Sequence, residues 1–148
     1  MRLFLYGTLQ PQADTAIAAW VRARVVDAQP ASVPGRLHGI DGGRGWYPAL
    51  VRGTGRVPGT LCALRLTRAE LALLDRYEGC EYRRVTLPVR TASGQRVPAQ
   101  AYLWRLAVPR GAPVIAGGFA EWLGRTARCA YAAQPRDFRA LAFRRACD

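Results

Sequence analysis

The stretch from Ala31 to Leu66 constrains the fold most, because it consists of short β-rich pieces separated by glycine and proline clusters. Two of these clusters are Gly42-Gly43 and Pro58-Gly59. The pieces between the clusters are Ser32–Ile40, Ala49–Arg52 and Gly59–Leu66. The pattern predicts a meander of strands, so the fold must be built around a sheet.

The best-marked helix follows this meander. Thr67–Glu70 reads as a capping box, in which the Thr hydroxyl accepts the N–H of the Glu and the Glu reaches back to the start of the helix. Leu71, Leu74 and Tyr77 then recur on one face. Gly79 supplies the left-handed residue that ends a helix. The sequence predicts a helix between Thr67 and Gly79.

Shorter signals complete the predicted order of elements. The apolar run Leu3–Leu5 predicts a buried strand that ends in a glycine turn. Further elements are expected as a helix over residues 14–26, strands over Tyr82–Arg90 and Pro98–Leu106, and a short helix over Phe119–Leu123. Strands outnumber helices, and the helices do not alternate with them one for one. This favours an α+β domain on a mainly antiparallel sheet, one that can close into a barrel.

Length and charge favour one intracellular domain. The 148 residues suit a single domain over residues 1–148, with an Arg-rich C-terminal extension over 126–148 whose segment Arg136–Arg145 has helical spacing. All 22 basic residues are Arg, and the net charge is +12. An ordinary solvated Arg surface is preferred over a phosphate-binding surface, because no nucleic-acid motif accompanies the charge. Without an export signal or a membrane-length apolar run, we expect a cytoplasmic protein with no nucleic-acid or membrane partner.

Several common chemistries lack their motifs. The sequence has no phosphate-binding P-loop, no dinucleotide fingerprint and no Gly-x-Ser-x-Gly elbow, and the absence of lysine excludes Schiff-base chemistry. His38 is the only histidine. The cysteines do not have the close spacing of a zinc site or a redox pair, so they are expected as free thiols: Cys62, Cys80, Cys129 and Cys147. No metal or cofactor is expected.

Glu78 is the acid whose position is unusual. It lies four residues after Leu74 and seven after Leu71, on the core-facing stripe of the predicted helix. It also lies at the C-terminal end, where the helix dipole opposes a carboxylate. Both effects should raise its pKa and suit it to act as a general base and then as a general acid. The alternative is an exposed helix-end carboxylate paired with Arg83 or Arg84.

The segment Tyr6-Gly7-Thr8-Leu9 is a second candidate feature. A strand that ends in Gly-Thr exposes consecutive backbone N–H groups and one hydroxyl. Such groups can cradle a carboxylate or a developing oxyanion. The alternative is a plain tight turn.

An ordered set of short motifs accompanies these two features. In chain order they are Tyr6-Gly7-Thr8-Leu9, Val33-Pro34-Gly35-Arg36-Leu37, Tyr47-Pro48-Ala49-Leu50, Val57-Pro58-Gly59-Thr60-Leu61, Leu74-Asp75-Arg76-Tyr77-Glu78-Gly79, Tyr82-Arg83-Arg84 and Ala101-Tyr102. In order and spacing this set resembles the gamma-glutamylcyclotransferase-like family, which includes gamma-glutamylamine cyclotransferases. The resemblance covers about residues 2 to 123.

The resemblance implies a small β-barrel with helices packed around it. It also implies a cyclotransferase that releases an amine and 5-oxoproline from a gamma-glutamyl amine or peptide, without a metal or cofactor. Glu78 matches the acid/base glutamate of the family. Tyr6, Gly7, Thr8 and Leu9 match its loop that binds the glutamyl portion, and Tyr82 is expected either to line the pocket or to belong to the core. The protein is expected as a monomer or small homo-oligomer. The alternative is a non-catalytic small-molecule-binding or regulatory domain of the same fold.

Overall fold

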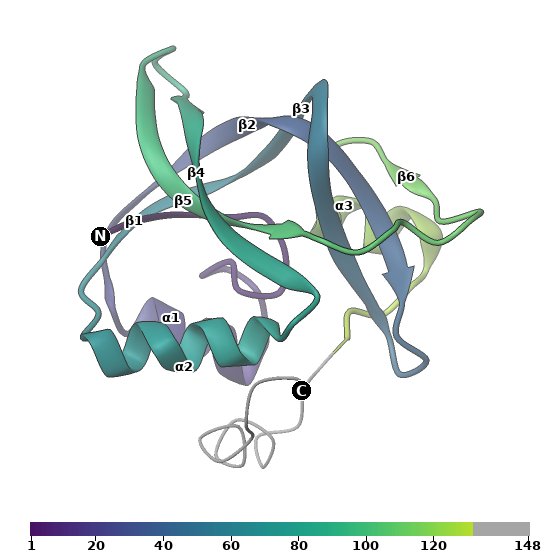
Figure 1. Cartoon of the computed structure of the whole chain (residues 1–148), viewed down its shortest axis with the longest axis horizontal. Coiled ribbons are helices and arrows are strands. Elements are labelled where there is room, and N and C mark those ends of the chain that lie inside the picture. Colours follow the sequence, from purple (N-terminus) through teal and green to yellow (C-terminus); the bar gives the residue numbers. More distant parts are fainter. Residues whose placement is uncertain (132–148) are drawn as a thin grey trace.

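The computed structural model describes residues 1–131. Six strands and three helices follow one another in this part of the chain (Figure 1). They are β1 Arg2–Leu5, α1 Ala16–Arg22, β2 Val25–Asp41, β3 Trp46–Leu64, α2 Arg68–Glu78, β4 Tyr82–Thr91, β5 Arg96–Trp104, β6 Val114–Ile115 and α3 Phe119–Thr126.

Five of the strands close into a barrel. They are hydrogen-bonded in the order β3-β1-β5-β4-β2, and a further pairing of β2 with β3 joins the two ends. The β1–β5 pairing is parallel and the others are antiparallel. Strand β6 extends the sheet from β2 outside the barrel. The expected small, mainly antiparallel barrel with flanking helices is therefore confirmed.

The predicted meander is a hairpin of two long strands, with 17 residues in β2 and 19 in β3. The prediction of short separate pieces was wrong because Ala49–Arg52 and Gly59–Leu66 both belong to β3, which runs through Pro58-Gly59. The Gly42-Gly43 cluster does separate β2 from β3. A bend also lies within β2. Gly35 has φ +157°, and a Cβ there would lie 2.8 Å from the carbonyl oxygen of Val51. The register between the strands shifts between Pro34 and Arg36. Beyond this bend, β2 leaves β4 and pairs with β6.

Strand β1 separates two hydrophobic layers, because successive side chains of a strand point to opposite faces. Phe4 belongs with Tyr6 to the cluster inside the barrel. Leu3 and Leu5 belong to a second cluster, which also holds Val21 of α1 and Leu74 of α2. Helices α1 and α2 therefore cover one side of the barrel, as Figure 1 shows.

Helix α2 is built as its sequence predicts. The Thr67 Oγ1 accepts a hydrogen bond of 3.2 Å from the N–H of Glu70, and the Glu70 carboxylate accepts one of 2.8 Å from the N–H of Thr67. At the other end Gly79 has φ +77°. The remaining two helices differ from expectation in length: α1 is shorter than residues 14–26, and α3 extends beyond Leu123 to Thr126.

Other sequence predictions have mixed outcomes. Cys62 is buried in the core and, like Cys129, is a free thiol, whereas Cys80 is disulfide-bonded. The expectation for Cys80 was wrong because a disulfide requires nearby Cα atoms in space and not close spacing in the chain.

The predicted helical segment Arg136–Arg145 lies outside the described residues. Within residues 1–131, no helix combines the length and hydrophobicity required to span a bilayer.

Candidate active site

Glu78 is the last residue of α2, on the stripe that packs toward the barrel. Leu74, one turn earlier, is fully buried, and Glu78 itself is half-buried. The negative charge of Glu78 helps to raise the pKa of phenol groups from several elements of the fold. These are Tyr6 after β1, Tyr77 of α2, Tyr82 of β4 and Tyr102 of β5. The helix thus carries this acid to a place where four tyrosines converge.

The environment of Glu78 favours its protonated form. Burial, followed by the negative charge of Asp75, raises the pKa of Glu78 to about 8. The ion pairs in the described part of the chain join Arg24 to Glu70 and Arg84 to Asp75. Arg84 is therefore paired with Asp75. Within residues 1–131 the alternative, an ion pair of Glu78 with Arg83 or Arg84, was wrong.

The segment Tyr6–Leu9 leaves β1 and turns beside the N-terminus of α1. The carbonyl oxygen of Gly7 accepts a hydrogen bond of 3.1 Å from the N–H of Gln10. The carbonyl oxygen of Thr8 accepts one of 3.0 Å from the hydroxyl of Thr15, which also caps α1. The carbonyl of Gly7 is thus held by the hydrogen bond that closes the turn, and the carbonyl of Thr8 is held by the cap of α1.

The N–H groups of this turn are not used in the same way. Among the hydrogen bonds formed between residues 1–131, none has the N–H of Gly7, Thr8 or Leu9 as its donor. Leu9 places its side chain in the core beside α1 and α2, so only its backbone is available to a ligand. Three successive donors without an acceptor in the described chain form the kind of arrangement that binds carboxylates or oxyanions.

The turn and the end of α2 lie together. The Thr8 side chain lies close enough to the Tyr77 hydroxyl to lower its pKa against the larger effects of burial and of the Glu78 charge, and Tyr77 immediately precedes Glu78. The hydroxyl of Tyr6 donates to the carbonyl oxygen of Tyr102. Tyr6 also lies close enough to Glu78 for the charge of Glu78 to help raise its pKa, after the larger effect of burial. The two features that the sequence singled out are therefore neighbours in space.

Tyr82 connects a third element to this site. Its hydroxyl donates a hydrogen bond of 2.7 Å to the carbonyl oxygen of Pro48, and its ring packs edge-on against Trp104 at 5.2 Å between centroids. Burial, followed by the charges of Tyr6 and Glu78, raises its pKa. Tyr82 therefore belongs to the packed interior and lies near Glu78, and its role in lining a substrate pocket stays a prediction.

Residues without a predicted role also belong to the site. Asp75 accepts hydrogen bonds from Arg84 and from the hydroxyl of Tyr102. Pro48 packs against Gly7. The spacing of Asp75 three residues before Glu78 places both on one helix face and was a usable signal. The partnership with β4 and β5 depends on strand pairing that spacing alone does not give.

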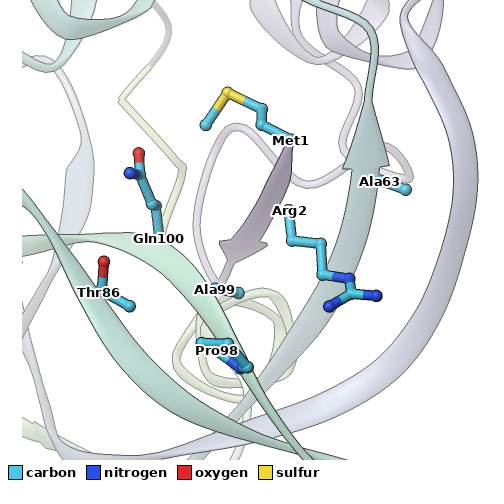
Figure 2. Close-up of a pocket in the computed structure, with 7 residues that line it drawn as sticks. All are labelled: Met1, Arg2, Ala63, Thr86, Pro98, Ala99 and Gln100. Atoms are coloured by element: carbon cyan, nitrogen blue, oxygen red, sulfur yellow. The ribbon is translucent and has the colours of Figure 1, made fainter.

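A separate open depression lies at the start of β1 (Figure 2). It has a volume of about 530 Å³ and contains none of the predicted site residues. Its lining consists of Met1, Arg2, Ala63, Thr86, Pro98, Ala99 and Gln100. The Gln100 side chain accepts a hydrogen bond from Arg84, which also donates to Asp75, so the depression adjoins one of the partners of Asp75.

Comparison with known proteins shows the family of this chain. The chain belongs to the family described as gamma-glutamyl cyclotransferase, AIG2-like, whose profile matches residues 3–122. It is 31% identical over 128 residues to Protein AIG2 C of Arabidopsis thaliana, which covers 81% of this chain and 70% of that protein. The family supports a cyclotransferase-type enzyme in general terms.

Solved structures show the same fold. A solution structure of an Arabidopsis thaliana protein matches with a TM-score of 0.60 and 30% identity, over 85% of this chain and 74% of that one. A crystal structure of an AIG2-like protein from Mus musculus matches with a TM-score of 0.68 and 20% identity, over 90% of this chain and 96% of that one. The barrel with its flanking helices is therefore the fold of this family.

Proposed function

We propose that this protein releases an amine and 5-oxoproline from a gamma-glutamyl amine or peptide, with Glu78 as the general acid and base. The observation that carries the proposal is the position of Glu78, half-buried, with a pKa of about 8, next to the turn Tyr6–Leu9. The described residues contain no group of His, Cys, Asp and Glu side chains arranged to hold a metal ion. The proposed reaction uses the substrate's own amine as its nucleophile.

The reaction is a ring closure within the substrate. The free α-amine nitrogen bonds to the γ-carbonyl carbon, and the bond from that carbon to the departing nitrogen breaks. Glu78 takes a proton from the attacking nitrogen and gives it to the departing one, so one carboxyl group serves both steps. Holding the amine against the carbonyl supplies part of the rate enhancement, up to about 7–11 kcal/mol in ideal cases.

The turn Tyr6–Leu9 binds the charged parts of the substrate. The N–H groups of Gly7, Thr8 and Leu9 donate to the substrate carboxylate or to the oxyanion that develops on the γ-carbonyl. One such donor is worth about 3 kcal/mol of transition-state stabilisation. Tyr82 lines the site and supports Pro48, which backs the turn.

A panel of gamma-glutamyl amines and dipeptides tests this function, with 5-oxoproline measured directly. The proposal predicts product from at least one compound and a loss of about 10²–10⁴-fold in kcat for Glu78→Gln. Glu70→Gln is the matched control, because it makes the same chemical change on the same helix at a residue paired with Arg24. Thermal stabilisation by these compounds without any product would instead support the binding-domain alternative.

A further inference from the structure

The carboxylate of Asp75 is held by three hydrogen bonds, and it lies beside the proposed catalytic acid. Arg84 donates to it twice, from Nε to Oδ1 at 2.8 Å and from Nη2 to Oδ2 at 3.1 Å. The hydroxyl of Tyr102 donates to Oδ1 at 2.7 Å. Three donors from two strands thus fix one side chain of α2.

These partners keep Asp75 ionised. Burial alone would raise the pKa of Asp75, but the hydrogen bonds from Arg84 and Tyr102 and the charge of Arg84 lower it. A bidentate Arg–carboxylate pair also fixes the direction of the carboxylate, because the guanidinium fork is planar and rigid. The negative charge therefore stays at a defined place in the last turn of α2.

Glu78 is the next acid on that helix face, three residues after Asp75. Titratable groups face it from the turn after β1 and from α2, β4 and β5. Apart from Asp75 they are the phenols of Tyr6, Tyr77, Tyr82 and Tyr102. The pKa of each phenol is raised, mainly by burial, so all four are neutral near pH 8. Asp75 is thus the ionised group that acts on Glu78 from the described part of the chain.

We propose that Asp75, fixed by Arg84 and Tyr102, is a positioning residue that makes Glu78 the stronger base of the two carboxylates. This inference rests on the proposed function. Two carboxylates one helical turn apart divide their roles when only one of them has a cationic partner. Asp75 holds its charge against Arg84, and Glu78 holds the proton that the ring closure moves.

The same residues tie this acid pair to the substrate turn. The backbone carbonyl of Tyr102 accepts the hydroxyl of Tyr6, while its own hydroxyl donates to Asp75. Arg84 also reaches Gln100, whose side chain lines the open depression seen in Figure 2. Asp75 is therefore connected through Tyr102 of β5 to Tyr6, which begins the turn that precedes α1.

Two variants that should shift the titration midpoint of Glu78 in opposite directions test the inference. Asp75→Asn removes the negative charge and keeps the size of the side chain, so the titration midpoint of Glu78 falls by about one pH unit. Arg84→Gln leaves the charge of Asp75 without its counter-charge, so the midpoint rises. Arg84→Lys restores the positive charge and returns the midpoint toward the parent value. The carboxyl ¹³C signal of Glu78, identified by its loss in Glu78→Gln, reports each midpoint.

The controls separate this inference from the proposed function. Glu70→Gln breaks the ion pair with Arg24 on the same helix and leaves the Glu78 midpoint unchanged. In kinetics, the acid limb of the kcat/KM profile moves with the midpoint in each variant. An unchanged midpoint in both Asp75→Asn and Arg84→Gln, or shifts in the same direction, overturns the inference. The NMR titration needs no turnover, so a protein without activity would refute the proposed function while the midpoints still decide the inference.

Discussion

The α-carbon of Gly7 packs against the ring of Pro48, so closely that a Cβ added at Gly7 would lie 2.5 Å from Cγ of Pro48. The carbonyl of the same proline accepts the Tyr82 hydroxyl. Gly7→Ala should therefore push the turn away from Pro48 and disturb its N–H groups. We expect a destabilisation of about 1–3 kcal/mol. The loss in kcat/KM, expressed as a free energy, should be larger than this loss of stability. Denaturant unfolding and turnover of the best panel substrate measure the two effects.

A second substitution checks the cause of that loss. Pro48→Ala removes the ring atoms nearest to Gly7 and keeps the carbonyl that Tyr82 contacts. The double variant Gly7→Ala/Pro48→Ala should recover part of the activity lost by Gly7→Ala alone. Effects of the two substitutions that simply add would show that the contact between these residues does not explain the loss.

The pH dependence of turnover follows from the pKa of Glu78, which burial and then Asp75 raise to about 8. The proposed base must be ionised before it can accept a proton from the substrate amine. We expect kcat/KM to fall about tenfold per pH unit below about pH 8 and to level off above it. A profile that is flat from pH 6 to 9 on a substrate that turns over would contradict the role of Glu78.

Stability should depend on pH through the same residue. The folded-state pKa of about 8 lies above the usual value of 4.5, so between these values the folded protein keeps a proton that the unfolded chain has released. The free energy of unfolding therefore falls as pH rises across this range, by at most about 1.4 kcal/mol per pH unit. Urea titrations of the parent protein and of Glu78→Gln should diverge up to about pH 8 and run parallel above it.

The two threonine caps should give different results. Thr15 accepts the N–H of Ala18 and donates to the carbonyl of Thr8, whereas Thr67 caps α2 away from the turn. Replacing either with Ala should cost about 1 kcal/mol of stability. Thr15→Ala should also lower kcat/KM, because it releases the substrate turn, and Thr67→Ala should not. Equal losses of activity in the two variants would show that the anchor from Thr15 has no special role.

The predictable parts of this protein are those written in local sequence. The capping box at Thr67, the stop at Gly79 and the inward position of Glu78 depend on residues within one helix, and the structure has all three. The family resemblance and the barrel were likewise predicted and are confirmed. The functional roles of Glu78, Tyr82 and the turn Tyr6–Leu9 stay predictions.

The unpredicted parts depend on contacts between distant segments. The continuity of β3 through Pro58-Gly59 is one such part, because a glycine that ends a strand and one that lies within it have the same local pattern. The partners of Asp75 come from β4 and β5, whose alignment with α2 is set only when the barrel closes. A carboxylate three residues before Glu78 was visible in the sequence, but its arginine could not be assigned.

The substrate turn presents backbone groups, since Leu9 is turned into the core and Gly7 has no side chain. Recognition of a ligand by this turn would then depend on the conformation of the main chain. A chain could keep the same specificity with other side chains around the turn, provided that a residue as small as glycine stays opposite the proline. New substrate preferences would accordingly arise from substitutions in the residues around the turn. The turn itself would continue to bind the part that all the substrates share.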